Sequence, residues 1–130
     1  EIAPGKRPLS SMTPTIVMKD GNFFFTTGSP GGSRIITAVL QSIINIVDYG
    51  MNLEEANAAK RIHHQWQPDL LQIESSINPE LKNQLLKLKY NIKIINPATC
   101  LQTIMFKDNM YYGYGDFRRP DAFASGEIND

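Results

Sequence analysis

The stretch TIVMKDGNFFFTTGSPGGSRIITAVLQSIINIV, residues 15–47, sets the order of elements on which the fold depends. Its first half predicts two strands, residues 15–19 and 22–27, because apolar, β-branched and aromatic side chains fill both runs. Asp20 and Gly21 stand between the two runs, and both tolerate the positive φ angles that a two-residue hairpin turn requires. The sequence therefore predicts an antiparallel hairpin here.

The second half of this stretch predicts a glycine-rich loop followed by a helix. The loop is GSPGGS, residues 28–33, and the helix covers residues 34–49, where apolar side chains recur at helical spacing until Gly50. Gly31 and Gly32 carry no Cβ, so their backbone can approach a ligand closely, next to the free N–H groups of the first helical turn. Such a loop suits an anion or a developing oxyanion. A tight turn without a ligand is the alternative interpretation.

The rest of the chain predicts two more helices and several strands. Asn52 and Glu55 have the spacing of a capping box, which predicts a helix to about residue 61, and Pro79 opens another to about residue 89. Further strands are predicted at residues 70–74, 91–95, 101–107 and 110–114. This order predicts an α+β fold with helices covering an antiparallel sheet. The unbroken run of phenylalanines, residues 23–25, predicts a strand covered on both faces, which asks for another layer.

Composition excludes several classes of protein. A chain of 130 residues suits one domain, and 13 basic and 13 acidic side chains cancel, which gives no overall field to attract nucleic acid or an anionic membrane. Cys100 is the single cysteine, so no internal disulfide can form, and it is predicted to be a small core residue. The most apolar stretch, residues 35–47, is too short and too polar to span a bilayer.

Two adjacent serines, Ser10 and Ser11, precede the first predicted strand and follow Lys6 and Arg7. Their hydroxyl and N–H groups can surround one carboxylate, and the neighbouring cations add positive charge. Hydrogen bonding within a turn is the alternative interpretation. No histidine or acidic residue lies close enough in the sequence to predict that either serine is an activated nucleophile.

The histidines and the charged tail predict no separate active site. His63 and His64 are neighbours without a companion ligand at metal-binding spacing, so we expect them to pack beside Trp66 and to hold no metal. The tail from about residue 116 is predicted to be a loop. Its charged side chains predict surface or interface ion pairs of little energetic weight, formed among Asp116, Arg118, Arg119 and Asp121.

Four segments together resemble the C-terminal part of the small subunit of γ-glutamyltranspeptidases. They are PGKRPLSSMTPTIV (4–17), GSPGGSRIITAVLQ (28–41), GMNLEEANAAKRIHHQW (50–66) and YYGYGDFRRPDAFASG (111–126). The resemblance implies an N-terminal-nucleophile (Ntn) hydrolase, an αββα sandwich of which this chain holds only part. Residues 1–130 would then be a single partial domain.

The resemblance also implies a function. The family hydrolyses or transfers the γ-glutamyl group of glutathione-like donors without a metal or organic cofactor. Ser10 and Ser11 would bind the donor's α-carboxylate, and Gly31 and Gly32 would supply oxyanion-hole N–H groups. The family's threonine nucleophile lies upstream of PLSSM, in a stretch that these residues do not include, so the chain on its own is predicted to be inactive. A large subunit and the remainder of the small subunit are the implied partners, in the periplasm or outside the cell.

The resemblance leaves alternatives open. Lys60 and Ile62 replace a proline and a phenylalanine of the family's usual pattern, which affects local packing more than chemistry. A related enzyme acting on another amide, such as a cephalosporin acylase or a poly-γ-glutamate hydrolase or transpeptidase, would share the scaffold. A non-catalytic module that binds small anions or supports assembly is a different class of function. The apolar strand and helix also predict self-association of the chain.

Overall fold

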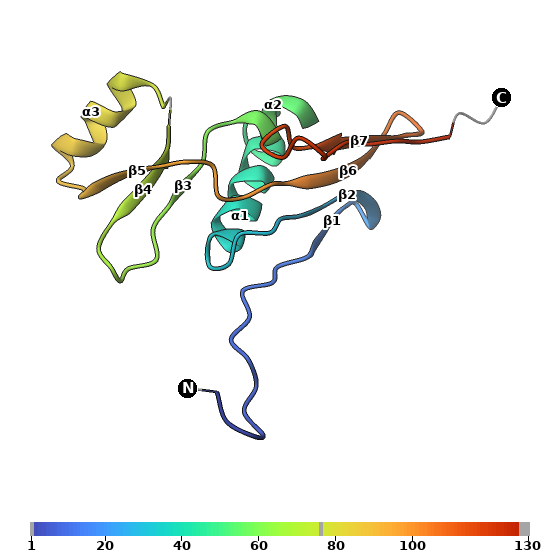
Figure 1. Ribbon diagram of the computed structural model, residues 1–130. Helices are drawn as coiled ribbons and strands as arrows, with labels where there is room; N and C mark the ends of the chain where they lie inside the picture. Colours follow the sequence, from blue (N-terminus) through green and yellow to red (C-terminus); the bar gives the residue numbers. More distant parts are fainter. Residues whose placement is uncertain (1, 76, 128–130) are drawn as a thin grey trace.

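The computed structural model describes residues 2–75 and 77–127. Its larger sheet is antiparallel throughout, in the order β1-β2-β6-β7. The strands are β1 (Thr15–Lys19), β2 (Asn22–Gly28), β6 (Gln102–Lys107) and β7 (Met110–Gly115). The last two strands of the chain therefore pair beside the first hairpin, which brings the two ends of the sequence into one sheet (Figure 1).

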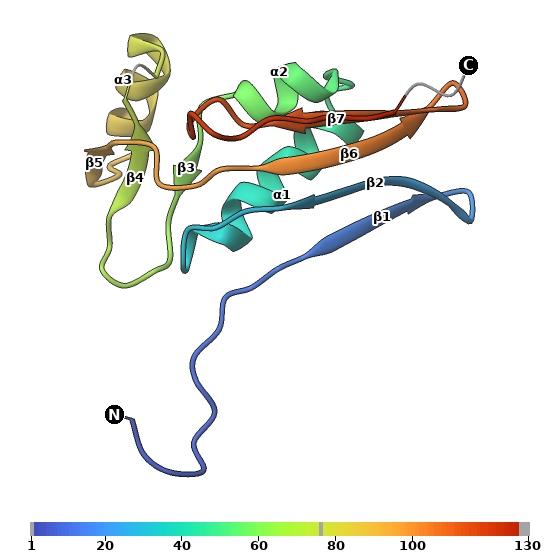
Figure 2. The same cartoon turned by 45° about the vertical axis from the view of Figure 1, so that its right-hand side comes forward.

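Two helices, α1 (Arg34–Val47) and α2 (Leu53–Ala58), cover one face of this sheet (Figure 2). Phe25, which is fully buried, packs there with Met105 and Ile46, and this cluster continues under α2. Burying such side chains contributes about 1.5–3 kcal/mol each, so this face holds the main core.

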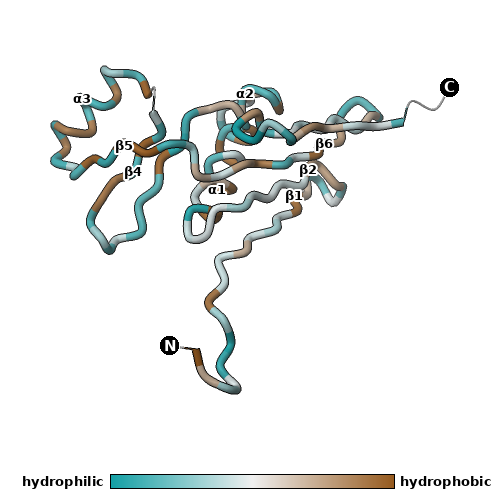
Figure 3. Tube along the Cα trace, in the orientation of Figure 1, coloured by the Kyte–Doolittle hydropathy of each residue, from teal (hydrophilic) through white to brown (hydrophobic). Residues whose placement is uncertain are grey.

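A smaller sheet lies beside the first, in the order β3-β4-β5. It consists of β3 (Ile62–His63), β4 (Leu71–Glu74) and β5 (Ile92–Ile95), and α3 (Pro79–Lys87) connects the last two. β4 and β5 run parallel, and α3 forms the crossover connection that parallel strands need. In Figure 3 hydrophobic and hydrophilic positions alternate along α3, and none of its residues is buried. The single antiparallel sheet that the sequence predicted is therefore wrong for this region.

Local signals in the sequence are confirmed. Asp20 and Gly21 have φ angles of 51° and 79°, which is the hairpin geometry predicted for them. The Asn52 side chain accepts from the Glu55 N–H at 2.9 Å and the Glu55 carboxylate accepts from the Asn52 N–H at 3.0 Å, so the capping box is complete. The second helix ends at Ala58, earlier than predicted.

Among the described residues the larger sheet is covered on one face only, so the second layer expected for the phenylalanine strand is not supplied by them. A register shift between Val17 and Met18 makes room for an extra residue in β2, so consecutive phenylalanines need not alternate between faces. Opposite the helices, Ile16 is 68% exposed and Ile104 is 48% exposed. These two residues align across the strands, since both pair with Thr26. The uncovered face is therefore apolar.

Candidate functional site

One end of the larger sheet gathers segments that are far apart in the sequence. Thr15 at the start of β1 pairs with Thr27, near the end of β2. Gln102 at the start of β6 pairs with Gly28 on one side and with Gly115, at the end of β7, on the other. We call this the shared sheet end. The segments that carry both predicted motifs leave from it.

The glycine loop, residues 28–33, leaves the shared sheet end and leads directly into α1. Gly31 has a φ of 142° and Gly32 a φ of 59°, backbone angles that residues other than glycine rarely adopt. The loop closes through hydrogen bonds from the Arg34 N–H to the Gly31 carbonyl at 3.3 Å and from the Ile35 N–H to the Gly32 carbonyl at 3.1 Å. Within the described part of the chain, the N–H groups of the two glycines donate no hydrogen bond. They lie at the N-terminal, positive end of the α1 dipole.

Ala98, Thr99 and Cys100 lie against this loop and support it. A Cβ at Gly31 would meet the Thr99 Cγ2 at 2.7 Å and the Ala98 carbonyl oxygen at 2.9 Å, so only glycine fits there. The Cys100 N–H donates to the Ser29 hydroxyl at 2.8 Å. Cys100 is buried, as predicted for a core residue. The backbone of the glycine loop is therefore seated on a segment that lies about 70 residues downstream in the chain.

The serine segment, residues 9–14, has no comparable support. The Ser10 hydroxyl accepts from the Met12 N–H at 3.3 Å, and the Thr13 hydroxyl donates to the Ser11 carbonyl at 2.9 Å. Both bonds link near neighbours, and the segment runs away from the body of the chain (Figure 1). The register of β1 and β2 brings the two motifs to the same sheet end, but no hydrogen bond joins either serine to the glycine loop among the described residues.

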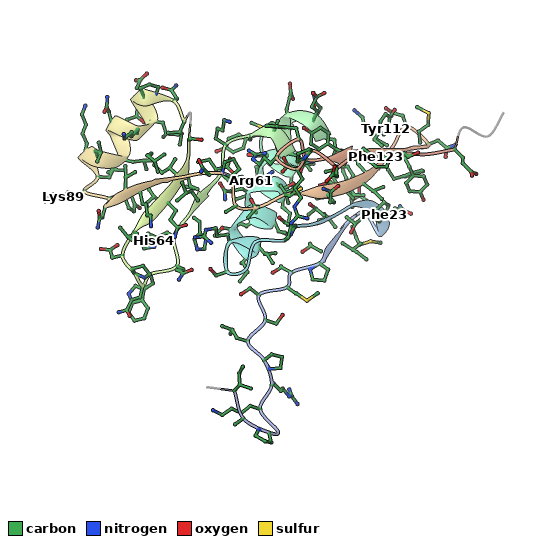
Figure 4. All side chains as sticks on the ribbon, in the orientation of Figure 1. Phe23, Arg61, His64, Lys89, Tyr112 and Phe123 are labelled. Atoms are coloured by element: carbon green, nitrogen blue, oxygen red, sulfur yellow. The ribbon has the colours of Figure 1, made fainter. Side chains whose placement is uncertain are left out.

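Four buried charges lie behind the shared sheet end. We call Arg61, Glu74, Asp116 and Arg118 the buried ion cluster. Arg61 lies at the junction of the two sheets (Figure 4), and its Nη2 is 2.6 Å from the Asp116 Oδ2. Arg118 joins Glu74 at 2.8 Å and Asp116 at 3.1 Å. Two guanidinium groups and two carboxylates balance in charge, which is what burial of such groups requires.

The buried ion cluster corrects the sequence-based expectation of surface ion pairs in the tail. Asp116 is 0% exposed, and its carboxylate also accepts from the N–H of Leu101, the residue before β6, at 3.0 Å. Burial alone would raise the pKa of Asp116, but hydrogen bonds from Arg61, Arg118 and Leu101 hold that pKa below its ordinary value. Asp116 and Arg118 thus fix the start of the tail to the core, whereas Arg119 and Asp121 are exposed.

The histidines serve different partners. His63 Nδ1 lies 2.8 Å from the Thr37 hydroxyl of α1, and its Nε2 lies 3.0 Å from the Gln65 Oε1. That same Gln65 oxygen accepts from the Ser33 hydroxyl at 2.7 Å, which ties the end of the glycine loop to the β3–β4 hairpin. His64 instead faces Asp69 at 3.1 Å. In residues 2–75 and 77–127, no three His, Cys, Asp or Glu side chains gather as metal ligands would.

Sequence reasoning missed Arg61, Glu74 and Thr99 as parts of the site's support. Each interacts with residues that are distant in the sequence, so no local pattern points to it. The available signal was the presence of Arg61 and Glu74 in otherwise packed segments, where a charge demands a partner.

The comparison with known proteins is decisive for the family. A sequence profile described as Gamma-glutamyltranspeptidase matches residues 1–126. The chain belongs to the γ-glutamyltranspeptidase family. The Glutathione hydrolase proenzyme of Escherichia coli (strain K12) is 46% identical over 126 residues, which cover 96% of this chain and 22% of that protein. The one from Pseudomonas sp. (strain A14) is 42% identical and is covered to 24%. The chain thus spans about a quarter or less of these γ-glutamyltranspeptidase-family relatives.

Solved structures of γ-glutamyltranspeptidases share the fold. A mutant of the Helicobacter pylori gamma-glutamyltranspeptidase superposes with a TM-score of 0.85 at 46% identity, over 91% of this chain and 66% of that one. The Pseudomonas nitroreducens enzyme complexed with L-DON gives 0.86 at 32% identity, over 99% and 67%. The predicted resemblance is confirmed, and so is the α+β class as part of an Ntn-hydrolase sandwich. None of the helices in the described part of the chain is long and apolar enough to cross a membrane.

Proposed function

We propose that this chain forms the C-terminal part of the small subunit of an enzyme that hydrolyses or transfers the γ-glutamyl group of glutathione-like donors. The observation that carries the proposal is the family match across residues 1–126, together with relatives named glutathione hydrolase proenzyme. The chain would contribute two loops at the shared sheet end to a larger active site.

The glycine loop is proposed to stabilise the tetrahedral intermediate. When a nucleophile's oxygen adds to the γ-carbonyl carbon, the carbonyl electron pair moves onto oxygen, which becomes negatively charged. The free N–H groups of Gly31 and Gly32, at the positive end of α1, can donate to that oxygen. Collapse of the intermediate then expels the amine with a proton, and water or an acceptor amine resolves the acyl-enzyme.

Ser10 and Ser11 are proposed to bind the donor's α-carboxylate. That group is charged in both the ground state and the transition state, so its contacts contribute mainly to donor binding. The serine segment leaves the same sheet end as the glycine loop, which supports a shared site. Among the described residues the Ser10 hydroxyl accepts from the Met12 N–H, and its own hydrogen can still be donated to a carboxylate.

The remainder of the enzyme is proposed to supply a threonine nucleophile and a second layer. Ile16 and Ile104 lie on the uncovered apolar face, which suits a covering sheet from the same subunit or the large subunit. Without that threonine, the 130-residue chain alone should show no γ-glutamyl transfer. Because its apolar face is uncovered, it should associate through this face. We propose a periplasmic or extracellular location, because the family resemblance implies it.

A second candidate is a transpeptidase that acts on poly-γ-glutamate instead of glutathione-like donors. It is favoured by the superposition with the Bacillus anthracis transpeptidase enzyme CapD, which has a TM-score of 0.78 at 26% identity. The higher identity to the glutathione hydrolase proenzymes makes glutathione-like donors the first choice.

The test uses the full-length enzyme that contains this chain, with γ-glutamyl-p-nitroanilide as donor and self-cleavage checked on a gel. Ser10→Ala and Ser11→Ala should each raise KM so that kcat/KM falls roughly tenfold or more, because a hydrogen bond to a charged group is worth about 1.5–3 kcal/mol. Gly32→Ala should instead lower kcat by up to about 10²-fold, since its φ of 59° resists a side chain and the donor would tilt. An unchanged kcat in Gly32→Ala would overturn the oxyanion assignment.

A further inference from the structure

Thr99 lies between the glycine loop and the buried ion cluster and touches both. On one side, a Cβ added at Gly31 would come within 2.7 Å of the Thr99 Cγ2 and 2.9 Å of the Ala98 carbonyl oxygen. On the other side, the Arg61 Nη1 donates to the carbonyl oxygen of Thr99 at 3.3 Å and to its hydroxyl oxygen at 3.0 Å. Arg61 is itself held by Asp116 at 2.6 Å. Hydrogen bonds therefore run from the cluster to Thr99, and the Thr99 methyl group lies close enough to Gly31 to exclude a side chain there.

We propose that Thr99 and Arg61 are positioning residues that fix where the glycine loop presents its two N–H donors. The proposal rests on the proposed role of Gly31 and Gly32 in binding the oxyanion. Arg61 is only 6% exposed and its Nη atoms are engaged by protein oxygens, so it acts through Thr99 and not on the substrate.

Placement matters because an oxyanion donor is effective only at about 2.7–3.1 Å from the charged oxygen, and a displacement of about 1 Å can cost roughly 10²-fold in rate. Gly31 and Gly32 are the least restrained residues that a chain can use, so their backbone needs an external support. The Thr99 methyl group limits how far the loop can sink, and the Cys100 N–H holds the Ser29 hydroxyl at 2.8 Å.

The two functions of the Thr99 side chain can be separated by substitution. Thr99→Val keeps a methyl group against Gly31 but removes the hydroxyl that Arg61 binds. Thr99→Ser keeps that hydroxyl and removes the methyl group. A matched control is Ser42→Ala, which removes a different buried hydroxyl that donates to the Asn57 side chain at 3.3 Å, inside α1 and away from the loop.

In the full-length enzyme, Thr99→Val should lower kcat about tenfold while KM changes less than about twofold, because the loop shifts by a fraction of an ångström. Thr99→Ser should also lower kcat. Ser42→Ala should leave both constants near those of the wild type, even where its melting temperature falls as much as that of Thr99→Val. This split between kcat and KM distinguishes positioning from a general loss of stability.

Gly32→Ala, assayed beside them, separates failure of this proposal from failure of the proposed function. If Gly32→Ala lowers kcat and Thr99→Val does not, the loop is catalytic and the positioning role is overturned. If Gly32→Ala has no effect, the oxyanion role itself fails. Should Thr99→Val not yield processed enzyme, an unchanged kcat in Thr99→Ser overturns the proposal, and a lowered kcat at constant KM supports it.

Discussion

The glycine loop and the serine segment leave the same end of the same sheet, yet the chain supports them in opposite ways. The glycine loop is seated on Thr99 and bonded through Ser29 to Cys100, far downstream in the sequence. In the part of the chain that the structure describes, Ser10 and Ser11 of the serine segment are hydrogen-bonded to their own near neighbours, Met12 and Thr13. The two motifs of the proposed site thus differ in how much of their geometry this chain determines.

This difference matches the chemistry proposed for each loop. Donors to a developing oxyanion must be in place before the reaction, because reorganising them during it would cost part of the stabilisation. A carboxylate that is charged throughout can itself order the groups that bind it, at a cost in affinity. Under the proposed function, the buried ion cluster would serve the loop whose position affects the chemical step.

The largest expected effect comes from opening the buried ion cluster. Asp116→Asn leaves Arg61 and Arg118 short of one carboxylate, and breaking a buried ion pair in this way typically costs about 3–5 kcal/mol. The melting temperature of the full-length enzyme should fall accordingly. Asp69→Asn is the matched control: Asp69 also faces a basic side chain, His64, but it is exposed, so melting should hardly change.

The same variant predicts a change in pH dependence. The folded-state pKa of Asp116 is lowered, so its contribution to stability is present above the unfolded-state pKa of about 3.9. That contribution is lost as the pH falls below this value toward the folded-state pKa. The wild type should therefore lose stability more steeply than Asp116→Asn below about pH 4 in thermal melts, and equal slopes would contradict a role for this carboxylate.

A second large effect should come from Gly31→Ala. Its Cβ would meet Thr99 and the rigid backbone oxygen of Ala98 at distances below 3.0 Å, whereas a Cβ at Gly32 would meet open space. We expect kcat to fall about 10²–10³-fold, as for loss of an oxyanion donor, and further than in Gly32→Ala. Equal losses in the two variants, measured with γ-glutamyl-p-nitroanilide, would argue that the support under the loop does not matter.

The sequence allowed accurate prediction wherever neighbours in the chain determine the structure. Asp20 and Gly21 predicted the hairpin turn, and Asn52 with Glu55 predicted the capped helix, because the partners lie within a few residues of each other. The family resemblance depended likewise on contiguous motifs.

Prediction failed where distant segments meet. The two-residue strand β3 is too short to show a pattern, and the parallel pairing of β4 with β5 depends on the whole crossover. Arg118 reads as a solvated surface charge until Glu74 and Asp116 are seen around it. Burial of a charge depends on partners that are brought together only by folding, so the buried ion cluster could not be predicted from any one segment.

A smaller effect should come from loosening the serine segment. Pro14 is exposed and immediately precedes β1, so chain stiffness is its main contribution to ordering the serines. Pro14→Ala should raise KM about two- to fivefold without changing kcat, as expected from about 0.4–1 kcal/mol of added chain entropy. A fall in kcat at constant KM would mean that this segment, too, positions the reacting groups.

The smallest expected effect tests the exposed support of the glycine loop against the buried one. The Ser33 hydroxyl donates to Gln65 at 2.7 Å, but this bond is exposed, so water can replace either partner. Ser33→Ala should therefore lower kcat only roughly two- to threefold, well below the effect of Thr99→Val, since an exposed hydrogen bond that water can replace lies at the low end of the range for such bonds, about 0.5 kcal/mol. If Ser33→Ala matched Thr99→Val in kcat, the loop would be held chiefly from the β3–β4 hairpin, and the contact through Thr99 would be secondary.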